Sequence, residues 1–245
     1  MANPNRTDYA GGEKGLGIIW VQSLIKDPDR LSAELFNRWY EEVHIPDILA
    51  AGNGGVVNAW RYEAVDPARS RPWMGVYKVP DVAFLSSDEF KAIPMSHPML
   101  PGPGPIHQWA DFDGRYYKHV QTWENDSNKI GRAPLLYSEE IEPEEGNQRD
   151  IKQWYADEYV GELSKRGGWR RSTLLKLIFR KEDKDDPNSA SIIVPTWLAL
   201  HEFEEGALQG VPELGRLDAA LGPTKKIERS LFRKMSEFGH IDATL

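Results

Sequence analysis

Two stretches decide the fold: residues 39–52, WYEEVHIPDILAAG, and residues 154–167, WYADEYVGELSKRG. The aromatic pair that opens each stretch recurs after 115 residues (154 − 39 = 115), and the acid and the glycine that follow keep the same spacing. A register shared over this many positions without a gap predicts an internal duplication. The two copies differ at one place of chemical interest, where the first has His44 and the second has Tyr159.

The hydrophobic pattern repeats in the same way. Helical spacing of apolar residues predicts helices over residues 31–51, 82–92, 149–165 and 208–221. Runs rich in β-branched and aromatic residues predict strands over 15–24, 56–65, 73–79, 113–123, 135–142, 172–180, 191–200 and 226–234. A charged turn is expected over 181–188 and a linker over 125–132. Each half therefore has the order β-α-β-β-α-β, which is the ferredoxin-like arrangement.

The predicted fold class is α+β, with two ferredoxin-like repeats whose sheets pair into one barrel. The first repeat is expected over residues 1–125, where it carries His44, and the second, degenerate repeat over 126–245. Each such sheet has one face covered by helices, and its bare face needs a partner, which the other repeat supplies. The chain would then be its own pseudo-dimer, with the space between the sheets as a ligand cavity.

Composition excludes several classes of protein. The absence of cysteine excludes a disulfide scaffold, a thiolate nucleophile and cysteine-ligated metal sites. A net charge of −8 argues against a nucleic-acid partner. No apolar run approaches membrane-spanning length, and residues 1–17 lack the apolar core of a signal peptide, so a cytoplasmic protein without a membrane partner is expected. The nine tryptophans and nine tyrosines suit a pocket for a flat organic ligand.

His44 is the leading catalytic candidate. It lies near the end of the first predicted helix, four residues after Tyr40, the second catalytic candidate, and therefore on the same helical face. Pro46 disfavours helical geometry at Ile45, so a histidine here could point into a cavity and exchange protons near neutral pH. The alternative is a structural histidine that is hydrogen-bonded to a backbone carbonyl freed by Pro46.

Further candidates lie in a proline-rich loop over residues 93–108 and on the strands. The loop is longer than its counterpart in the second copy, which is typical of a lid, and it carries His97 as a third catalytic candidate and His107 as a substrate contact; the alternative is a surface loop. Aromatic residues complete the predicted substrate-binding set, although core packing is the alternative for each of them: Trp20, Trp60, Tyr62, Trp73, Tyr77 and Tyr159. No metal-binding motif is present in the sequence.

The stretch FNRWYEEVHIPDI, residues 36–48, resembles the dimeric α/β-barrel superfamily, and within it the EthD-like branch, which carries an aromatic residue followed by His-x-Pro at the end of the first helix. Tyr40, His44 and Pro46 match this pattern. The repeat extends the resemblance to residues 15–238, but Tyr159 and Gly161 replace the histidine and proline in the second copy. The superfamily includes polyketide cyclases, decarboxylases, lactone isomerases, quinol-forming monooxygenases and heme proteins.

The resemblance implies a cofactor-independent enzyme of lyase, cyclase or isomerase type. Its substrate would be hydrophobic and polyketide-like or aromatic, bound in a pocket between sheet and helices, and decarboxylation, cyclisation and isomerisation all fit. Two alternatives remain open: a heme-binding oxidoreductase, for which the second copy offers His201 and His240, and a non-catalytic accessory protein that binds a small molecule. A homodimer of pseudo-dimeric chains is a further expectation.

Overall fold

The computed structural model describes residues 9–125, 130–146, 150–181, 193–209, 221–240 and 242–245. Elements of the first half follow in this order: β1 (Gly17–Ile25), α1 (Ala33–Trp39), η1 (Tyr40–His44), α2 (Ile45–Ala50), β2 (Asn58–Ala64), β3 (Trp73–Val79), η2 (Val82–Ser86), α3 (Asp88–Lys91), η3 (Ile106–Gln108) and β4 (Ala110–Glu124). The second half contains β5 (Leu135–Pro143), α4 (Ile151–Trp154), η4 (Tyr155–Tyr159), α5 (Val160–Ser164), β6 (Trp169–Lys181), β7 (Trp197–Phe203), η6 (Glu205–Gln209) and β8 (Thr224–Gly239).

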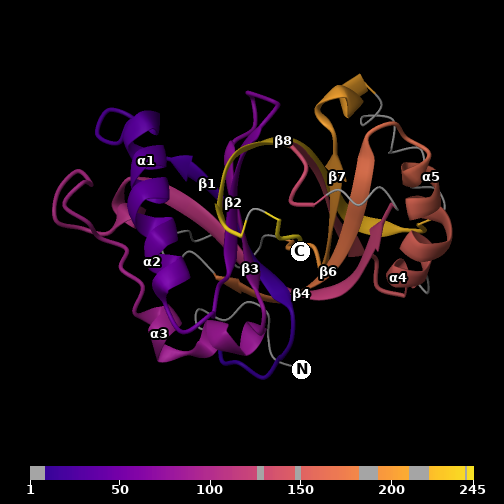
Figure 1. Ribbon diagram of the computed structural model, residues 1–245, viewed down its shortest axis with the longest axis horizontal. Coiled ribbons are helices and arrows are strands. Elements are labelled where there is room, and N and C mark those ends of the chain that lie inside the picture. The colour runs from indigo at the N-terminus through magenta and orange to yellow at the C-terminus, as the bar shows by residue number, and fades with distance from the viewer. Residues whose placement is uncertain (1–8, 126–129, 147–149, 182–192, 210–220, 241) are drawn as a thin grey trace.

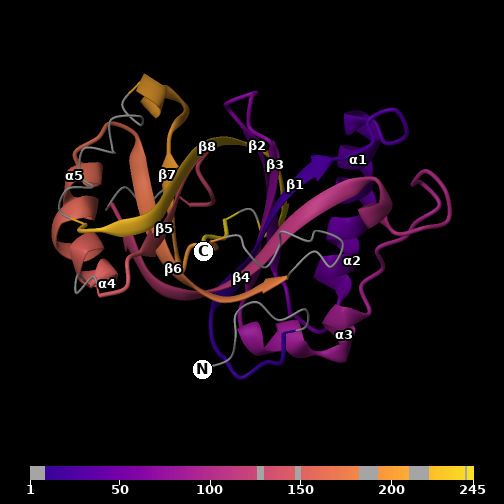
Figure 2. The ribbon, with the colours of Figure 1, turned by 180° about the vertical axis from the view of Figure 1, so that it is seen from behind.

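The eight strands form one closed antiparallel barrel in the order β1-β3-β2-β8-β5-β7-β6-β4. Within it, β4-β1-β3-β2 and β8-β5-β7-β6 are two four-stranded groups, and they join at two hydrogen-bonded seams, β2 with β8 and β4 with β6. Helices α1–α2 and α4–α5 cover opposite sides of the barrel (Figures 1 and 2). The predicted α+β class and the pairing of two sheets into one barrel are confirmed.

Strand alternation separates the barrel interior from the two layers under the helices. The interior is filled by large side chains that are at most 1% exposed, among them Trp20, Trp60, Tyr62, Leu136, Leu198 and Phe232. Residues next to these in sequence, such as Ile19 and Ala59, face the opposite way, into the layer between strands β4-β1-β3-β2 and helix α1–α2. This is the first helical layer. The expected ligand cavity between the sheets is therefore occupied by a packed core, which is how small barrels are commonly filled.

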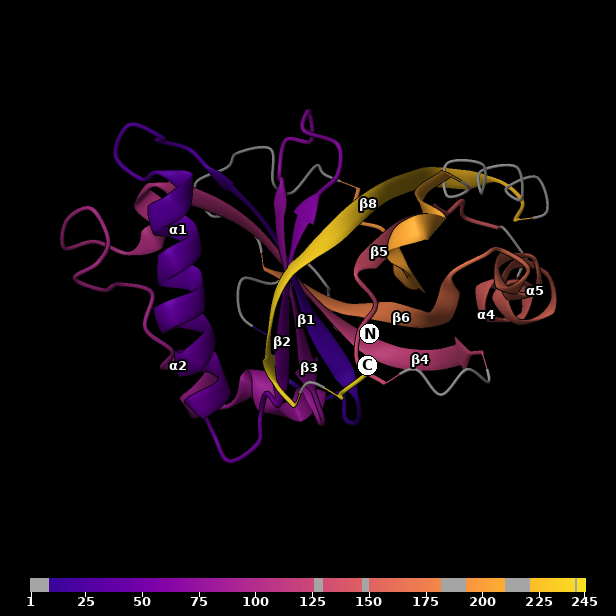
Figure 3. The ribbon, with the colours of Figure 1, turned by 45° about the horizontal axis from the view of Figure 1, so that its top comes forward.

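Each helical layer is built on a helix that is interrupted by one π turn. In the first half the helix runs from residue 33 to residue 50, as Figure 3 shows for α1 and α2, and Ser32 caps its start by accepting a hydrogen bond from the Leu35 amide. At η1 the Ile45 amide donates to the Tyr40 carbonyl, five residues earlier. The helix then continues through Pro46, so the proline does not end it.

The second half has the same π turn 115 residues later, at η4, where the Val160 amide donates to the Tyr155 carbonyl. No proline follows here, so Pro46 is not required for the turn. A π turn inserts one extra residue into a helix and often marks a functional site. In both halves the π turn lies within the repeated stretch of sequence, residues 39–52 in the first half and 154–167 in the second.

Several predicted elements differ from the structure. The expected helix over residues 82–92 is two short helical turns, η2 and α3, separated at Ser87, whose hydroxyl caps α3. The strand predicted over 191–200 is β7, which begins at Trp197 and extends to Phe203. Residues 182–188 of the charged turn, part of the linker and most of the helix over 208–221 lie outside the described residues. No helix in the described ranges is long and apolar enough to cross a membrane.

Candidate functional site

His44 is the last residue of η1, and it lies buried between the helix and the first sheet with 8% of its surface exposed. Its ring stacks on Trp39, with centroids 4.8 Å apart, and meets Tyr40 edge-on at 5.2 Å. Its Nδ1 is buried and has no hydrogen-bond partner among the described residues, so this nitrogen does not make the bond to a freed carbonyl that the alternative interpretation expects. Burial, reinforced by the positive charge of Arg61, lowers the pKa of His44 to about 3, so the imidazole is neutral near pH 7.

Tyr40 and Tyr77 form a buried pair of hydroxyls beside His44. The Tyr77 hydroxyl donates to that of Tyr40 over 3.0 Å, and burial raises the pKa of both phenols. Gly75 leaves the space that this pair occupies, because a Cβ there would lie 3.2 Å from each hydroxyl oxygen. Helix α1, η1 and strand β3 thus bring a neutral imidazole and two protonated phenols into one layer.

Arg61 belongs to the same layer and was not predicted as a site residue. It alternates on β2 with Trp60 and Tyr62, which face the barrel interior, so its side chain lies under the helix. Its guanidinium carbon lies 4.0 Å from the Tyr40 ring centroid, and Nη2 donates to Asn37 Oδ1 over 2.8 Å. The alternation of two aromatic residues around an arginine was the sequence signal that could have placed it.

The remaining predicted residues of the first half lie in three different places. Trp73 joins the His44 layer, where it packs on Phe36 with ring centroids 5.3 Å apart. His107, in η3, is exposed but close enough for its charge to lower the pKa of His44. His97 makes a local contact, with Nδ1 accepting a hydrogen bond from the Met99 amide. Three of the predicted substrate contacts lie on the opposite face of the sheet, in the barrel interior: Trp20, Trp60 and Tyr62.

The second half contains a buried ionic network that the sequence analysis missed. Glu139 accepts hydrogen bonds from Tyr155 over 3.1 Å and from Arg229 over 2.7 Å, and His201 Nε2 lies 3.1 Å from it. His201 Nδ1 lies 2.8 Å from the Ser172 hydroxyl. Burial opposes the charge on Glu139, but the bonds to His201 and Arg229 prevail and lower its pKa to about 2. This carboxylate is therefore ionised at every physiological pH.

The same network bears on heme. Both ring nitrogens of His201 are engaged, by Ser172 and Glu139, so an axial bond to iron would break one of these two contacts. His240 follows β8 at the surface. Among the described residues, the second half therefore offers a buried proximal ligand only if His201 gives up Ser172 or Glu139. Within the described residues, no three side chains of His, Cys, Asp or Glu gather as a metal site.

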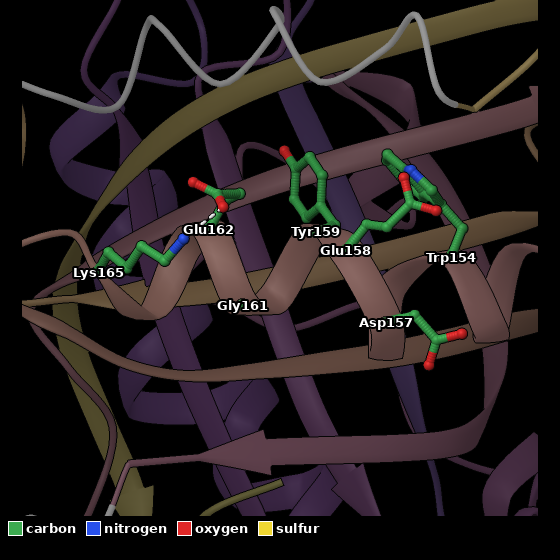
Figure 4. Close-up of a pocket in the computed structure, with 7 residues that line it drawn as sticks. All are labelled: Trp154, Asp157, Glu158, Tyr159, Gly161, Glu162 and Lys165. Carbon is green, nitrogen blue, oxygen red and sulfur yellow. Dashed lines mark hydrogen bonds and ion pairs between the residues drawn. The ribbon is translucent and has the colours of Figure 1, made fainter.

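A pocket of about 470 Å³ lies against helix α4–α5 of the second half (Figure 4). Its lining residues are Trp154, Asp157, Glu158, Tyr159, Gly161, Glu162 and Lys165. The Tyr159 side chain is fully buried, and its hydroxyl has no hydrogen-bond partner at bonding distance among the described residues. Three carboxyl groups against one lysine make this lining acidic, which disfavours an anionic ligand.

Comparison with known proteins supports the fold. No family model matches the chain. Core atranone cluster (CAC) protein 1 of Stachybotrys chlorohalonatus (strain IBT 40285) is 26% identical over 197 residues, which is 77% of this chain and 82% of that protein. The crystal structure of an anthrone oxidase-like protein superimposes with a TM-score of 0.59 at 14% identity, covering 92% of this chain and 93% of that one. A chlorite dismutase variant from Candidatus Nitrospira defluvii, in complex with cyanide, gives a TM-score of 0.53 at 11% identity, with 92% of each chain covered.

These structural neighbours are dimeric α/β-barrel proteins, and at such low identities the likeness establishes the fold alone.

Proposed function

We propose that this chain is a cofactor-independent acid–base enzyme that acts on a hydrophobic, polyketide-like or aromatic small molecule. The site is the layer between the first sheet and helix α1–α2. The carrying observation is His44, a buried neutral imidazole whose Nδ1 has no partner among the described residues, next to the hydroxyl pair of Tyr40 and Tyr77. We also propose that the chain arose by tandem duplication of an EthD-like unit, which the matching strand orders and π turns of the two halves support.

The proposed chemistry begins with removal of a proton from a carbon next to a carbonyl group. His44 Nδ1 accepts this proton, and the carbonyl oxygen gains the negative charge of an enolate. Tyr40 keeps its own hydroxyl proton and can donate it to that oxygen, as a preorganised donor does in an oxyanion hole, while Tyr77 holds the Tyr40 hydroxyl in place by donating to it. The imidazolium is disfavoured in the free site, so the nearby enolate would stabilise it as an ion pair. Isomerisation and cyclisation share this first step, and a decarboxylation ends on the same enolate.

Two comparisons are consistent with this proposal. The relative named for the atranone cluster supports a role in making a small organic molecule. The anthrone oxidase-like neighbour is named for a compound with an acidic C–H bond next to aromatic rings. The heme alternative receives less support, since iron binding by His201 would break its contact with Ser172 or with Glu139.

The proposal can be tested without knowledge of the natural substrate. Anthrone in D2O exchanges the protons of its activated methylene group, and NMR measures the rate of this exchange. We expect the wild-type protein to accelerate it and His44→Gln to lower the acceleration by about 100-fold, which is typical for loss of a general base. His240→Gln changes an exposed histidine and is the matched control. Exchange at the wild-type rate in the His44 variant would refute the assignment, and a Soret band in the purified protein would favour heme.

A further inference from the structure

Arg61 differs from every other buried arginine that the structure describes. Five arginines are buried, with between 1% and 6% of their surface exposed: Arg61, Arg115, Arg132, Arg171 and Arg180. Four of them have a carboxylate within 4.0 Å: Arg115 pairs with Glu140 and Asp113, Arg132 and Arg171 with Glu202, and Arg180 with Asp113. Within the described residues, Arg61 has none, although only 1% of it is exposed.

The hydrogen bonds of Arg61 are also incomplete. Nη2 donates to Asn37, whereas Nε and Nη1 are buried without a partner among the described residues. Glu41 lies on the same interrupted helix as Asn37, but its carboxylate accepts a hydrogen bond from the Ser236 hydroxyl at 2.6 Å and does not pair with Arg61. The ring of Tyr40, whose centroid lies 4.0 Å from the guanidinium carbon, stabilises the cation through its π face but carries no negative charge.

A buried guanidinium without an anion is costly, and proteins normally pair such charges. His44 and both phenols in this layer are neutral at pH 7, so none of them compensates the charge. A cost of this kind is typical of a site whose partner is a ligand. Because a guanidinium matches the planar, delocalised charge of a carboxylate, the missing partner has the chemistry of a carboxylic acid.

We propose that Arg61 is the receptor for a carboxylate on the ligand of the first helical layer, so that the substrate is an aromatic or polyketide-like acid. The carboxylate takes one of the two unpartnered donors, Nε–H or Nη1–H, which lie on different edges of the guanidinium, and the apolar part of the acid lies among the rings of Phe36, Trp39 and Tyr40. Arg61 then binds the ground-state substrate, while His44 remains the base. The acidic lining of the pocket on α4–α5 makes the second half an unsuitable place for the same acid.

This inference rests on the proposed function for the location of the ligand, but its test measures binding and needs no turnover. The probes are anthracene-2-carboxylate and anthracene-2-carboxamide, which differ in charge and have similar shape. Binding to the full chain is followed by probe fluorescence and by calorimetry. We expect the wild-type protein to prefer the acid, and Arg61→Gln to weaken acid binding by about 10- to 100-fold while changing amide binding little. Arg38→Gln, which changes an exposed arginine of α1, should bind both probes like the wild type.

Arg61→Lys separates charge from shape: it should recover part of the preference for the acid, because it keeps the charge but loses the planar fork. Three outcomes would overturn the proposal: no binding of the acid to the wild type at millimolar concentration, equal affinity of the wild type for acid and amide, or equal weakening of both probes by Arg61→Gln. Loss of exchange activity in His44→Gln is measured separately. The assignment of Arg61 as a carboxylate receptor can therefore be correct even if the assignment of His44 as the base is wrong, and the reverse also holds.

A second measurement uses the protein without any ligand. Removal of an unpaired buried charge should stabilise the fold, so Arg61→Met should leave the melting temperature unchanged or raise it. Arg132→Met is the matched comparison, and it should lower the melting temperature because Glu202 loses the closer of its two arginine partners, at 3.0 Å, and keeps only Arg171 at 3.8 Å. If both variants lower the melting temperature equally, Arg61 is a structural residue and the inference is wrong.

Discussion

Replacement of Glu139 by glutamine should destabilise the protein at neutral pH and also remove part of its sensitivity to acid. The carboxylate is completely buried and receives bonds from Tyr155, Arg229 and His201 on three different elements. The variant keeps the side-chain shape but removes the negative charge that Arg229 Nε contacts at 2.7 Å. Because Arg229 is partly exposed, with 23% of its side chain accessible, we expect the lower end of the usual penalty, about 3 kcal/mol in the free energy of unfolding at pH 7.

The pKa of Glu139 gives the same magnitude and fixes the sign of the pH dependence. The pKa falls from 4.5 to about 2 on folding, and at about 1.36 kcal/mol per pH unit this difference of 2.5 corresponds to about 3 kcal/mol. A lowered carboxyl pKa stabilises the folded state above the unfolded value of 4.5, and this contribution is lost as the pH falls toward 2. At pH 3.5 about 1.4 kcal/mol of it should be gone.

The assay is urea denaturation of wild type and Glu139→Gln between pH 7 and pH 3.5, followed by tryptophan fluorescence. The stability difference between the two proteins should shrink by about 1.4 kcal/mol over this range. His44 also destabilises the folded protein as the pH falls below 6.5, because its folded pKa is about 3, but it is present in both proteins and cancels. Glu63→Gln, at an exposed position on β2, is the control. A difference that stays constant to within about 0.5 kcal/mol would refute the reasoning.

Three further predictions concern the first helical layer. Gly75→Ala should cost about 1–3 kcal/mol of stability in urea denaturation, because the new Cβ would lie 3.0 Å from the buried Tyr77 ring; an unchanged midpoint would contradict the packing. Tyr77→Phe should cost about 0.5–1.5 kcal/mol by removing the bond to Tyr40, and a larger loss would indicate a further partner. The imidazole of His44 should remain neutral in an NMR titration until the pH approaches 3, and a midpoint near 6.5 would show that it is solvated.

Local patterns predicted most of the elements. The helices expected over 31–51 and 149–165 lie at 33–50 and 151–164, because their apolar spacing and their caps are encoded within a few residues. The helix expected over 82–92 was less well predicted, since Ser87 can start a helix as well as lie within one, and in the structure it starts α3. The π turns could not be predicted, because each depends on one shifted backbone hydrogen bond.

The candidate site was only partly predictable, for a different reason. Tyr40 and His44 were found because they lie on one helix. Glu139 and His201 are 62 residues apart on β5 and β7, and only strand register brings them together. Periodicity showed that Trp60 and Tyr62 share a face of β2 but not which face, and the structure places that face inside the barrel. Arg61 lies on the opposite face.

The joining of both sheets in one polypeptide has a genetic consequence. In a barrel made of two identical chains, every mutation appears twice, so a residue that suits one layer must also be tolerated in the other. Here Tyr40 meets the phenol of Tyr77, whereas its counterpart Tyr155 meets the ionised Glu139. In a single chain, a mutation changes only one of the two layers. Selection can therefore keep an unpaired arginine in the first layer and a completed ion pair in the second.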